Sequence, residues 1–403
     1  MVSGSMKSIA SSLLPQEEML EVAKKKGKLL IGIPKETSFQ ENRVPLVPET
    51  VALLTNNGHE IIIEREAGKA ANFQDNDYSE AGAIIVNSAE EVYKADIILK
   101  VAPPSLAEIE MMKQKQTLIS ALQLTVQPKN YIQKLLAKRV TAIAWDYIID
   151  EEKIFPVVRA MGEIAGNTAI LIAAEYLSNV NKGQGLMLGG ISGVTPTEVV
   201  ILGAGTVGEY ATRAALGLGA SVKLFDNSIY KLRRLQNDIG TRLFTCTIQP
   251  KELLKALKTA DVVIGAIRAP HGRTPCIVTE EMVNTMKFGS VIVDVSIDQG
   301  GCFETSQVTT HQAPVYTKYG VIHYCVPNIP SRVARTASLA LSNIFAPIFL
   351  NIGDEGGIEK ALKKDKGVRN GVYVYKGILT SRFLGDMLQL PYKDINLIIA
   401  TGF

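Results

Sequence analysis

Short apolar runs alternate with helix-length segments along the first part of the chain. The runs have the length and aliphatic content of buried strands, and the segments between them have the length of connecting helices. Strands are predicted at residues 29–33, 60–64, 83–86, 96–101, 117–122 and 141–145, with helices at 48–57, 89–94, 106–113 and 128–139. Strands that alternate with helices of this length are typical of βαβ units, which build a parallel sheet.

The alternation continues in the second part of the chain. Strands are predicted at residues 199–202, 221–225, 261–266, 290–297 and 321–326, with helices at 209–218 and 336–350. The apolar stretch 166–177 predicts a buried connecting helix. Two parallel sheets are therefore expected, one in each part of the chain.

A glycine-rich turn connects one of these strands to a helix. Gly203, Gly205 and Gly208 directly follow the apolar run 199–202, and Asp226 ends the next predicted strand. In a dinucleotide fold the first glycine makes the tight turn, the second lets backbone approach a pyrophosphate, and the third lets the helix lie close to the strand. A carboxylate about 20 residues on accepts the ribose hydroxyls and repels a 2′-phosphate, so NAD is favoured over NADP. The alternative is a tight turn in an α/β core without a ligand.

The fold class is therefore α/β, with two doubly wound parallel-sheet domains separated by an interdomain cleft. We expect a Rossmann-type NAD domain at 157–334 and a discontinuous, flavodoxin-like substrate domain at 1–156 and 335–403. The last segment joins the first domain because about 70 residues without a motif are too few for an ordinary separate domain. The predicted cofactor-binding residues are Gly203, Ala204, Gly205, Thr206, Val207, Gly208, Asp226, Ile267 and Asn328.

Composition narrows the choice of partners. Hydrophobic residues make up 46% of the chain and the net charge is +3, which predicts a globular protein without a nucleic-acid or membrane partner. No apolar run approaches the roughly 18 residues that span a bilayer, and residues 1–28 lack the apolar core of a signal peptide, so a cytoplasmic location is expected. The four cysteines form no CxxC pair and the four histidines have no metal-ligand spacing, so no metal site is predicted.

Four polar residues lie at predicted carboxyl ends of strands, the edge where parallel α/β sheets bind ligands. Arg43 follows the first strand, Lys100 lies at the end of the strand 96–101, and Gln123 and Asp298 follow later strands. We expect them to meet in the cleft. Each also has an ordinary interpretation: Lys100 can be a snorkelling surface lysine, Asp298 a turn residue, Arg43 a loop arginine and Gln123 a surface amide.

At this point the sequence resembles a known family. The opening Ile31-Gly-Ile-Pro-Lys-Glu with Glu41-Asn-Arg-Val resembles the alanine dehydrogenases and their relatives, the NAD(H)-binding soluble part of proton-translocating transhydrogenases. Further similar segments are Lys100-Val101, Ile164-Ala165-Gly166, residues 290–301, His323-Tyr324 and Asn328-Ile329-Pro330. The resemblance extends from residue 29 to about residue 350, and the ending Ile-Asp-Gln-Gly-Gly at 297–301 favours the dehydrogenase branch.

The resemblance implies roles for particular residues. In the family an arginine and a lysine bind the substrate carboxylate, and these fall on Arg43 and Lys100; a catalytic aspartate falls on Asp298. The family's acid/base histidine falls on Gln123, and a serine near the cofactor falls on Gly162. Glutamine can orient a carbonyl by hydrogen bonding but cannot carry a proton. The resemblance also implies a homohexamer.

The leading hypothesis is NAD-dependent oxidative deamination of a small L-amino acid, most simply L-alanine to pyruvate and ammonium. Asp298, Lys100 and Gln123 are the predicted catalytic residues, with Asp298 carrying the proton and Gln123 only orienting. Lys100 is a second candidate base if burial and Arg43 lower its pKa. Two alternatives stay open: a dehydrogenase for a different amino acid, whose side chain Gln123 would read, and an NAD(H)-binding module without dehydrogenase activity.

Overall fold

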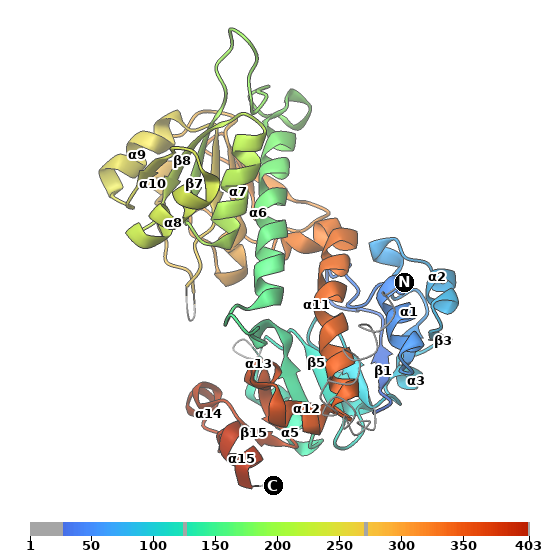
Figure 1. Cartoon of the computed structure of the whole chain (residues 1–403). Helices are drawn as coiled ribbons and strands as arrows, with labels where there is room; N and C mark the ends of the chain where they lie inside the picture. Colours follow the sequence, from blue (N-terminus) through green and yellow to red (C-terminus); the bar gives the residue numbers. More distant parts are fainter. Residues whose placement is uncertain (1–26, 124–126, 270–272, 402–403) are drawn as a thin grey trace, which may run out of the picture.

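The computed structural model describes residues 27–123, 127–269 and 273–401. Within these residues the strands form two sheets, one of 8 strands and one of 7. Figure 1 shows the two domains that the sheets define, with the long helix α6 (Pro156–Leu177) running from one to the other. The predicted α/β class with two mostly parallel sheets is confirmed.

The first sheet has the order β3-β2-β1-β4-β5-β6, followed by β14 and β15, which pair antiparallel. Its strands are β1 Leu30–Ile33, β2 Glu60–Glu64, β3 Ile84–Val86, β4 Ile97–Leu99, β5 Thr117–Ser120, β6 Thr141–Ala144, β14 Val372–Tyr375 and β15 Ile378–Leu379. A flavodoxin-like order would place the third strand beside the first, whereas here the fourth strand lies there. The prediction of a flavodoxin-like first domain is therefore wrong. Apolar periodicity identifies strands, but it does not give the direction of each crossover.

The helices of the first domain start where the sequence offers caps. They are α1 Pro48–Asn56, η3 Lys69–Ala71, α2 Asp75–Glu80, α3 Ala89–Val92, α4 Leu106–Met111, α5 Lys129–Ala137 and η4 Trp145–Tyr147. At α4 the cap is reciprocal: Ser105 Oγ accepts from the Glu108 amide at 3.2 Å, and Glu108 Oε2 accepts from the Ser105 amide at 2.7 Å. This capping box fixes the side chain of Glu108, which matters for the site described below.

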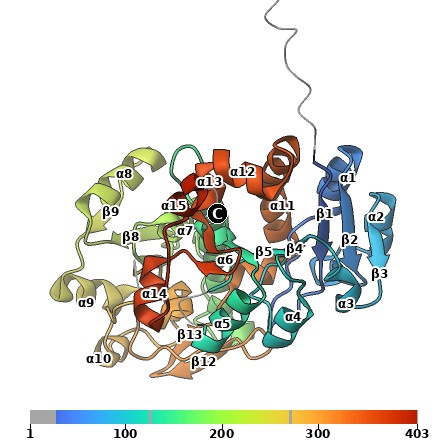
Figure 2. The same ribbon diagram turned by 90° about the horizontal axis from the view of Figure 1, so that it is seen from below.

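The C-terminal segment packs on the first sheet. After α11 (Ala334–Asp354) come α12 Ile358–Lys364, α13 Lys366–Asn370, the strands β14 and β15, α14 Arg382–Leu388 and α15 Ile395–Thr401. Leu379 and Leu384 share a core with Tyr131 and Leu135 of α5, and Figure 2 shows α14 beside α5. This docking agrees with the expectation from the sequence, whereas β14 and β15 were not predicted. The boundaries after residues 156 and 334 stay a prediction.

The second sheet has the order β9-β8-β7-β10-β11-β13, with β12 antiparallel at the edge. Its strands are β7 Glu198–Leu202, β8 Ser221–Phe225, β9 Phe244–Cys246, β10 Val262–Gly265, β11 Val291–Asp294, β12 Val315–Lys318 and β13 Val321–Tyr324. Its helical segments are η5 Asn179–Asn181, α7 Thr206–Gly217, α8 Ile229–Ile239, α9 Pro250–Thr259, α10 Glu280–Val283, η6 Val295–Gln299 and η7 Ile329–Val333. In both sheets the first strand lies between the second and the fourth, so each sheet has a switch point beside its first strand, where ligands bind in this fold.

Helix α6 begins at Pro156, well before the predicted start at residue 166. The glycines of this segment weakened the helical signal in the sequence, since glycine disfavours a helix interior. The structure shows why one of them is there: a Cβ on Gly166 would lie 2.4 Å from the carbonyl oxygen of Val207 in α7. Close contact between the two helices therefore requires glycine at this position.

Two helical segments, Pro156–Leu177 and Ile329–Asp354, are long and apolar enough to cross a membrane by length and composition. The expectation that no segment approaches this length therefore needs correction. Both segments belong to the protein core, however. Ala169 and Ile170 of α6 pack in the core of the second domain, and Leu341 and Phe345 of α11 pack in the core of the first.

Candidate active site

The glycine turn at the switch point of the second sheet has the geometry of a dinucleotide loop. Gly203 has φ of +111°, and a Cβ there would lie 2.4 Å from the carbonyl oxygen of Ala266. A Cβ on Gly208 would lie 1.8 Å from the carbonyl oxygen of Gly203, so α7 could not approach β7 with any larger residue. A Cβ on Gly205 would meet nothing within 4 Å. The turn thus leaves open space in front of the first turn of α7, where a phosphate binds in this fold.

Asp226 lies beside this turn, as predicted. Its Oδ2 accepts from the amide of Ala204 at 2.8 Å and its Oδ1 accepts from the amide of Ser228 at 2.7 Å. These bonds fix the carboxylate against the loop. Ile267 follows β10 on the other side of the switch point, and its amide donates to Ser296 Oγ at 3.0 Å. The arrangement fits the ribose of a dinucleotide whose pyrophosphate lies over Gly205.

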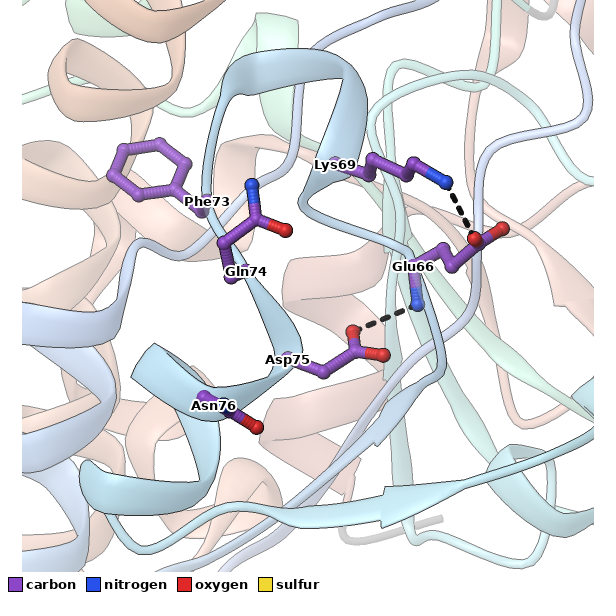
Figure 3. A pocket seen from close by; sticks show the side chains of 6 residues that line it. All are labelled: Glu66, Lys69, Phe73, Gln74, Asp75 and Asn76. Carbon is purple, nitrogen blue, oxygen red and sulfur yellow. Dashed lines mark hydrogen bonds and ion pairs between the residues drawn. The ribbon is translucent and has the colours of Figure 1, made fainter.

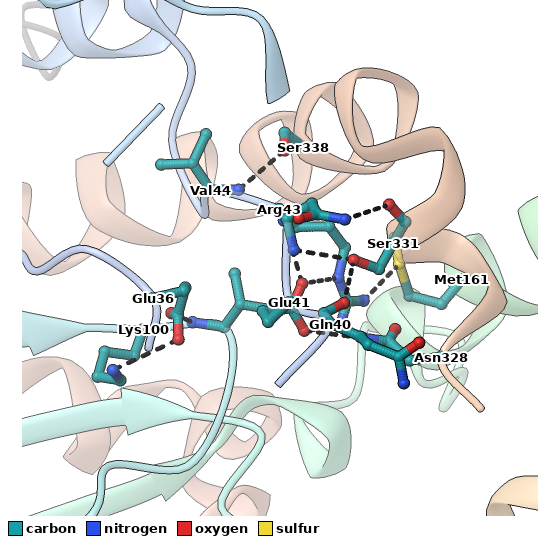
Figure 4. A network of polar contacts seen from close by, with 12 residues as sticks. Glu36, Gln40, Glu41, Arg43, Val44, Lys100, Met161, Asn328, Ser331 and Ser338 are labelled. Carbon is teal, nitrogen blue, oxygen red and sulfur yellow. Dashed lines mark hydrogen bonds and ion pairs between the residues drawn. The ribbon is translucent and has the colours of Figure 1, made fainter. Parts of the chain in front are cut away.

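At the switch point of the first sheet, Lys100 is completely buried between two carboxylates. Its Nζ lies 2.7 Å from Glu108 Oε1. The same Nζ lies 3.3 Å from Glu36 Oε2 (Figure 4). Burial opposes the charged form, but the two carboxylates outweigh it and raise the pKa of Lys100. Lys100 was a second candidate base on the condition that burial and Arg43 lower its pKa, and this condition is not met because two acidic partners raise it.

Arg43 forms a bidentate ion pair with Glu41. Its Nε lies 2.7 Å from Glu41 Oε1 and its Nη2 lies 2.6 Å from Glu41 Oε2, while Nη1 points to the sulfur of Met161 at 3.3 Å. The Arg43 residue is 8% exposed. Glu41 thus occupies one edge of the guanidinium and fixes its plane, and the Nη1 side keeps donors for a second anion.

Serines from the C-terminal part of the chain hold the loop that carries Arg43. The amide of Val44 donates to Ser338 Oγ at 2.9 Å, and the amide of Asn42 donates to Ser331 Oγ at 2.8 Å (Figure 4). Ser331 Oγ in turn donates to the carbonyl of Gln40 at 2.7 Å. The position of Arg43 therefore depends on residues almost 300 positions away in the sequence, as these contacts show.

Asp298 and Asn328 bring the second domain to this loop. The Asn328 amide donates to Asp298 Oδ1 at 3.0 Å, and its side-chain Nδ2 donates to Glu41 Oε2 at 3.0 Å. Asp298 is accessible to water but lies among protein atoms, and this partial loss of hydration raises its pKa. The hydrogen bond from the Asn328 amide and the charge of Arg43 oppose the rise. The structure thus joins Asp298, Asn328, Glu41 and Arg43 in one network across the domain junction.

Gln123 lies apart from this network. It follows β5 as predicted, but its side chain is exposed and makes no hydrogen bond within the described part of the chain. The backbone at Leu122 and Gln123 has φ of +45° and +43°, and residues 124–126 lie outside the described ranges. Gly162 faces the start of α7, because a Cβ there would lie 3.3 Å from Thr206 Cγ2.

Glu36 and Glu41 lie in the similar segments quoted above, but no role was predicted for them, and Glu108 and Asp146 were not identified from the sequence. Only Trp145 separates Asp146 from the end of β6, so the strand-end rule that selected Arg43 applied to it as well. Its Oδ1 is buried without a hydrogen-bond partner in the described residues, and burial raises its pKa to about 7, opposed by the charge of Arg268. Glu108 lies on a helix, where no comparable signal exists in the sequence.

A polar hollow lies around η3 and α2. It is lined by Glu66, Lys69, Phe73, Gln74, Asp75 and Asn76 (Figure 3). Its polar groups serve local structure: Asp75 Oδ1 accepts from the Glu66 amide at 2.8 Å, and Lys69 Nζ lies 2.6 Å from Glu66 Oε1. Among the described residues no cluster of three or more acidic, histidine or cysteine side chains has the arrangement of a metal site.

The fold and the site define a class: a two-domain α/β protein with a dinucleotide loop in one domain and a polar site at the junction with the other. Residues 32–165 match the family description "Alanine dehydrogenase/PNT, N-terminal domain", and residues 169–382 match "Alanine dehydrogenase/PNT, C-terminal domain". The chain belongs to this family, and the resemblance noted in the sequence is confirmed.

Individual relatives agree with this assignment. An alanine dehydrogenase of Mycolicibacterium smegmatis is 40% identical over 367 residues, which cover 91% of this chain and 98% of that protein. Alanine dehydrogenase 2 of Staphylococcus aureus is 38% identical over 366 residues, with coverage of 91% and 98%. A solved L-alanine dehydrogenase has a TM-score of 0.84 at 38% identity and covers 89% of this chain. A transhydrogenase from Sinorhizobium meliloti, at 23% identity and a TM-score of 0.75, shares the fold.

Proposed function

We propose that the chain is an NAD-dependent amino-acid dehydrogenase that converts L-alanine, NAD⁺ and water to pyruvate, ammonium, NADH and a proton. The observation that carries this proposal is the network at the domain junction. This network links the two domains through Arg43, which is paired with Glu41, and through Asp298 and Asn328. Asp298 has a raised pKa, and the second domain also carries the glycine loop. The relatives named above as alanine dehydrogenases cover nearly the whole chain.

Arg43 binds the substrate carboxylate in this proposal. Its Nη1 edge offers donors that Glu41 does not occupy, and Glu41 fixes the guanidinium plane so that little conformational entropy is lost on binding. Lys100 is the second cation of the proposed carboxylate site, and its ammonium is buried. Two cations near one carboxylate orient the Cα–H bond for transfer, which is the positioning that a hydride step requires.

Asp298 carries the proton in this proposal. NAD⁺, when bound, accepts the hydride from Cα. The remaining steps need a group that takes a proton first from the amine and then from the water that adds to the imine. Asp298 is accessible to water, and its raised pKa makes it a better base than an ordinary aspartate. Gln123 orients the substrate by hydrogen bonding in this proposal, without carrying a proton.

NAD fits the second domain because Gly205 leaves room for a pyrophosphate and Asp226 presents a fixed carboxylate beside it. We propose that Gly203 to Gly208, Asp226, Ile267 and Asn328 bind it, and that the negative charge of Asp226 excludes NADP. Partners are then a small amino acid and its 2-oxo acid. A cytoplasmic location and the absence of nucleic-acid and membrane partners belong to the same proposal.

A homo-oligomer, specifically a homohexamer, is also proposed. It is supported by a segment between η5 and β7 that projects from the second domain (Figure 1). This segment exposes apolar side chains: Met187 is 63% exposed, Ile191 66% and Val194 56%. Apolar residues gathered on a projecting segment are typical of a surface that another chain covers.

One experiment tests the activity. NADH oxidation is followed with pyruvate and ammonium, and then with a panel of larger 2-oxo acids. Turnover with pyruvate above all others is the expected result. Turnover only with a larger 2-oxo acid would assign a different amino acid, and NADH binding without turnover on any acid would assign a binding module without dehydrogenase activity.

A further inference from the structure

Lys100 is bound by two carboxylates that differ in how firmly they are held. Glu108 has both oxygens engaged, with Oε1 at 2.7 Å from Lys100 Nζ and Oε2 accepting from the Ser105 amide at 2.7 Å. Glu36 has its Oε1 fixed by the Val101 amide at 2.6 Å. Its Oε2 makes no hydrogen bond within the described residues and lies 3.3 Å from Lys100 Nζ. Glu36 is therefore the more loosely bound partner.

The cluster carries one more negative than positive charge. The side chains of Lys100, Glu36 and Glu108 are 0%, 4% and 7% exposed, so water compensates little of this excess. The charged and titratable groups around Glu36 are Lys100 at the end of β4, Glu41 in the loop after β1, Tyr93 at the end of α3 and Glu108 on α4. Burial raises the pKa of Glu36 to about 7, although the positive charge of Lys100 opposes the rise. The negative charge of Glu41 raises it further.

A substrate carboxylate that approaches Lys100 would add another negative charge to this cluster. Two carboxylates already surround the buried Lys100 ammonium. The substrate carboxylate can therefore bind this ammonium only if Glu36 or Glu108 loses its charge or moves away. Glu108 is fixed by the capping box, whereas the free oxygen of Glu36 can accept a proton in place.

We propose that Glu36 is a positioning residue that takes up one proton from solvent when the substrate carboxylate binds, and thereby releases the Lys100 ammonium to the substrate. The inference rests on the proposed function, because it takes Arg43 and Lys100 as the carboxylate site. The charge balances: Lys100 with ionised Glu36 and Glu108 becomes Lys100 with ionised Glu108 and the substrate carboxylate. The proton comes from an acid in the solvent, whose bond to that proton breaks as the O–H bond on Glu36 forms, and no other bond changes.

The test uses the full-length protein saturated with NAD⁺ and titrated with pyruvate, a pair that cannot react by hydride transfer. In weakly buffered solution at pH 8, a pH indicator should report close to one proton taken up per pyruvate bound. The Kd for pyruvate should rise by about tenfold per pH unit above pH 7.5, because the bound form carries a proton that the free form lacks. Native protein that binds pyruvate at pH 8 without proton uptake overturns the proposal before any variant is made.

Glu36→Gln mimics the protonated form and should give a pyruvate Kd that is independent of pH, near the native value at pH 6, with no proton uptake. Glu36→Asp keeps the carboxylate and should retain both the slope and the uptake. Glu110→Gln is the matched control, since Glu110 lies exposed on the same helix as Glu108, and it should behave like the native protein. If the pyruvate Kd of Glu36→Gln depends on pH as steeply as that of the native protein, the proposal is overturned. Absence of pyruvate binding at every pH would contradict the proposed function as well, whereas turnover with a pH-independent Kd contradicts this inference alone.

Discussion

The side-chain amide of Asn328 lies 3.0 Å from Oε2 of Glu41, and this hydrogen bond joins the second domain to the loop that carries Arg43. The same residue donates its backbone amide to Asp298. Asn328 has φ of +58°, a conformation that asparagine and glycine adopt more readily than other residues. One residue thus connects the proposed carboxylate site with the proposed proton carrier.

Asn328→Gly removes the side-chain amide while the backbone conformation stays favourable. We expect kcat/KM for pyruvate to fall by about 10- to 100-fold, the value of a hydrogen bond to a charged group, with little change in Tm. Steady-state kinetics and thermal unfolding measure the two effects. Asn328→Ala should lose the same activity but also lower the Tm, because alanine disfavours this φ. An unchanged kcat/KM in Asn328→Gly would contradict the role of this contact.

The glycines of the turn should separate stability from cofactor binding. A Cβ on Gly205 meets open space, so Gly205→Ala should fold with a native Tm yet weaken NADH binding where the pyrophosphate lies. A Cβ on Gly208 would lie 1.8 Å from the Gly203 carbonyl oxygen, so Gly208→Ala should lower the Tm. Thermal unfolding and NADH fluorescence titration test the pair. Equal NADH affinity in native protein and Gly205→Ala would show that the pyrophosphate lies elsewhere.

Asp226 should set the choice between the two dinucleotides. The native protein should bind NADH far more tightly than NADPH, because a fixed carboxylate repels a 2′-phosphate. Asp226→Ala should narrow this difference, mainly by weakening NADH binding. The control is Asp238→Ala, which removes an exposed carboxylate from α8 and should leave both affinities unchanged. Equal affinities in the native protein would refute the assignment.

Asp298→Asn should lower kcat for alanine deamination by about 10²- to 10⁴-fold, the usual value of general acid–base catalysis. Asparagine can still accept from the Asn328 amide, so the fold should persist. In the native protein kcat/KM should rise with pH through the raised pKa of Asp298 and then level off, since a base acts in its ionised form. The variant should lack this limb. Robust turnover in Asp298→Asn would assign the proton to another group.

Gln123→His offers the complementary test of the proton carrier. If the side chain at position 123 contacts the substrate, the new histidine should raise the pyruvate rate and add a limb to the pH profile near its pKa of about 6.5. If Gln123 stays exposed as in the structure, the pH profile should match that of the native protein.

Asp146 should make stability depend on pH. Its pKa is raised to about 7 by burial, so the folded protein binds this proton more tightly than the unfolded chain. The stabilising contribution is complete below the ordinary value of 3.8 and is lost as the pH rises to about 7. Asp146→Asn should therefore raise the Tm at pH 8 more than at pH 5, and Asp386→Asn, at an exposed site, should change neither. A Tm difference that does not vary with pH would contradict this.

The sequence by itself determined where the strands that are buried on both faces form and where the dinucleotide loop lies. Apolar runs recur with strand length at β1, β4, β7 and β10 because these strands are buried on both faces, which leaves little freedom in composition. The spacing of Gly203, Gly205 and Gly208 is equally local, since each glycine serves the turn in which it lies. The strands β9, β12, β14 and β15 were missed because they gain their structure from pairing with neighbouring strands.

Only the tertiary structure decided the order of strands and the partners of the polar residues. The Rossmann order of the first sheet depends on crossover directions, which no periodicity records. Lys100 is followed by Glu108 eight positions on and lies far in sequence from Glu36, as the two contacts show. Its pKa rises because folding brings both carboxylates to one ammonium, whereas burial alone would have lowered it. Electrostatic character is set by neighbours in space, and for this site those neighbours come from distant parts of the chain.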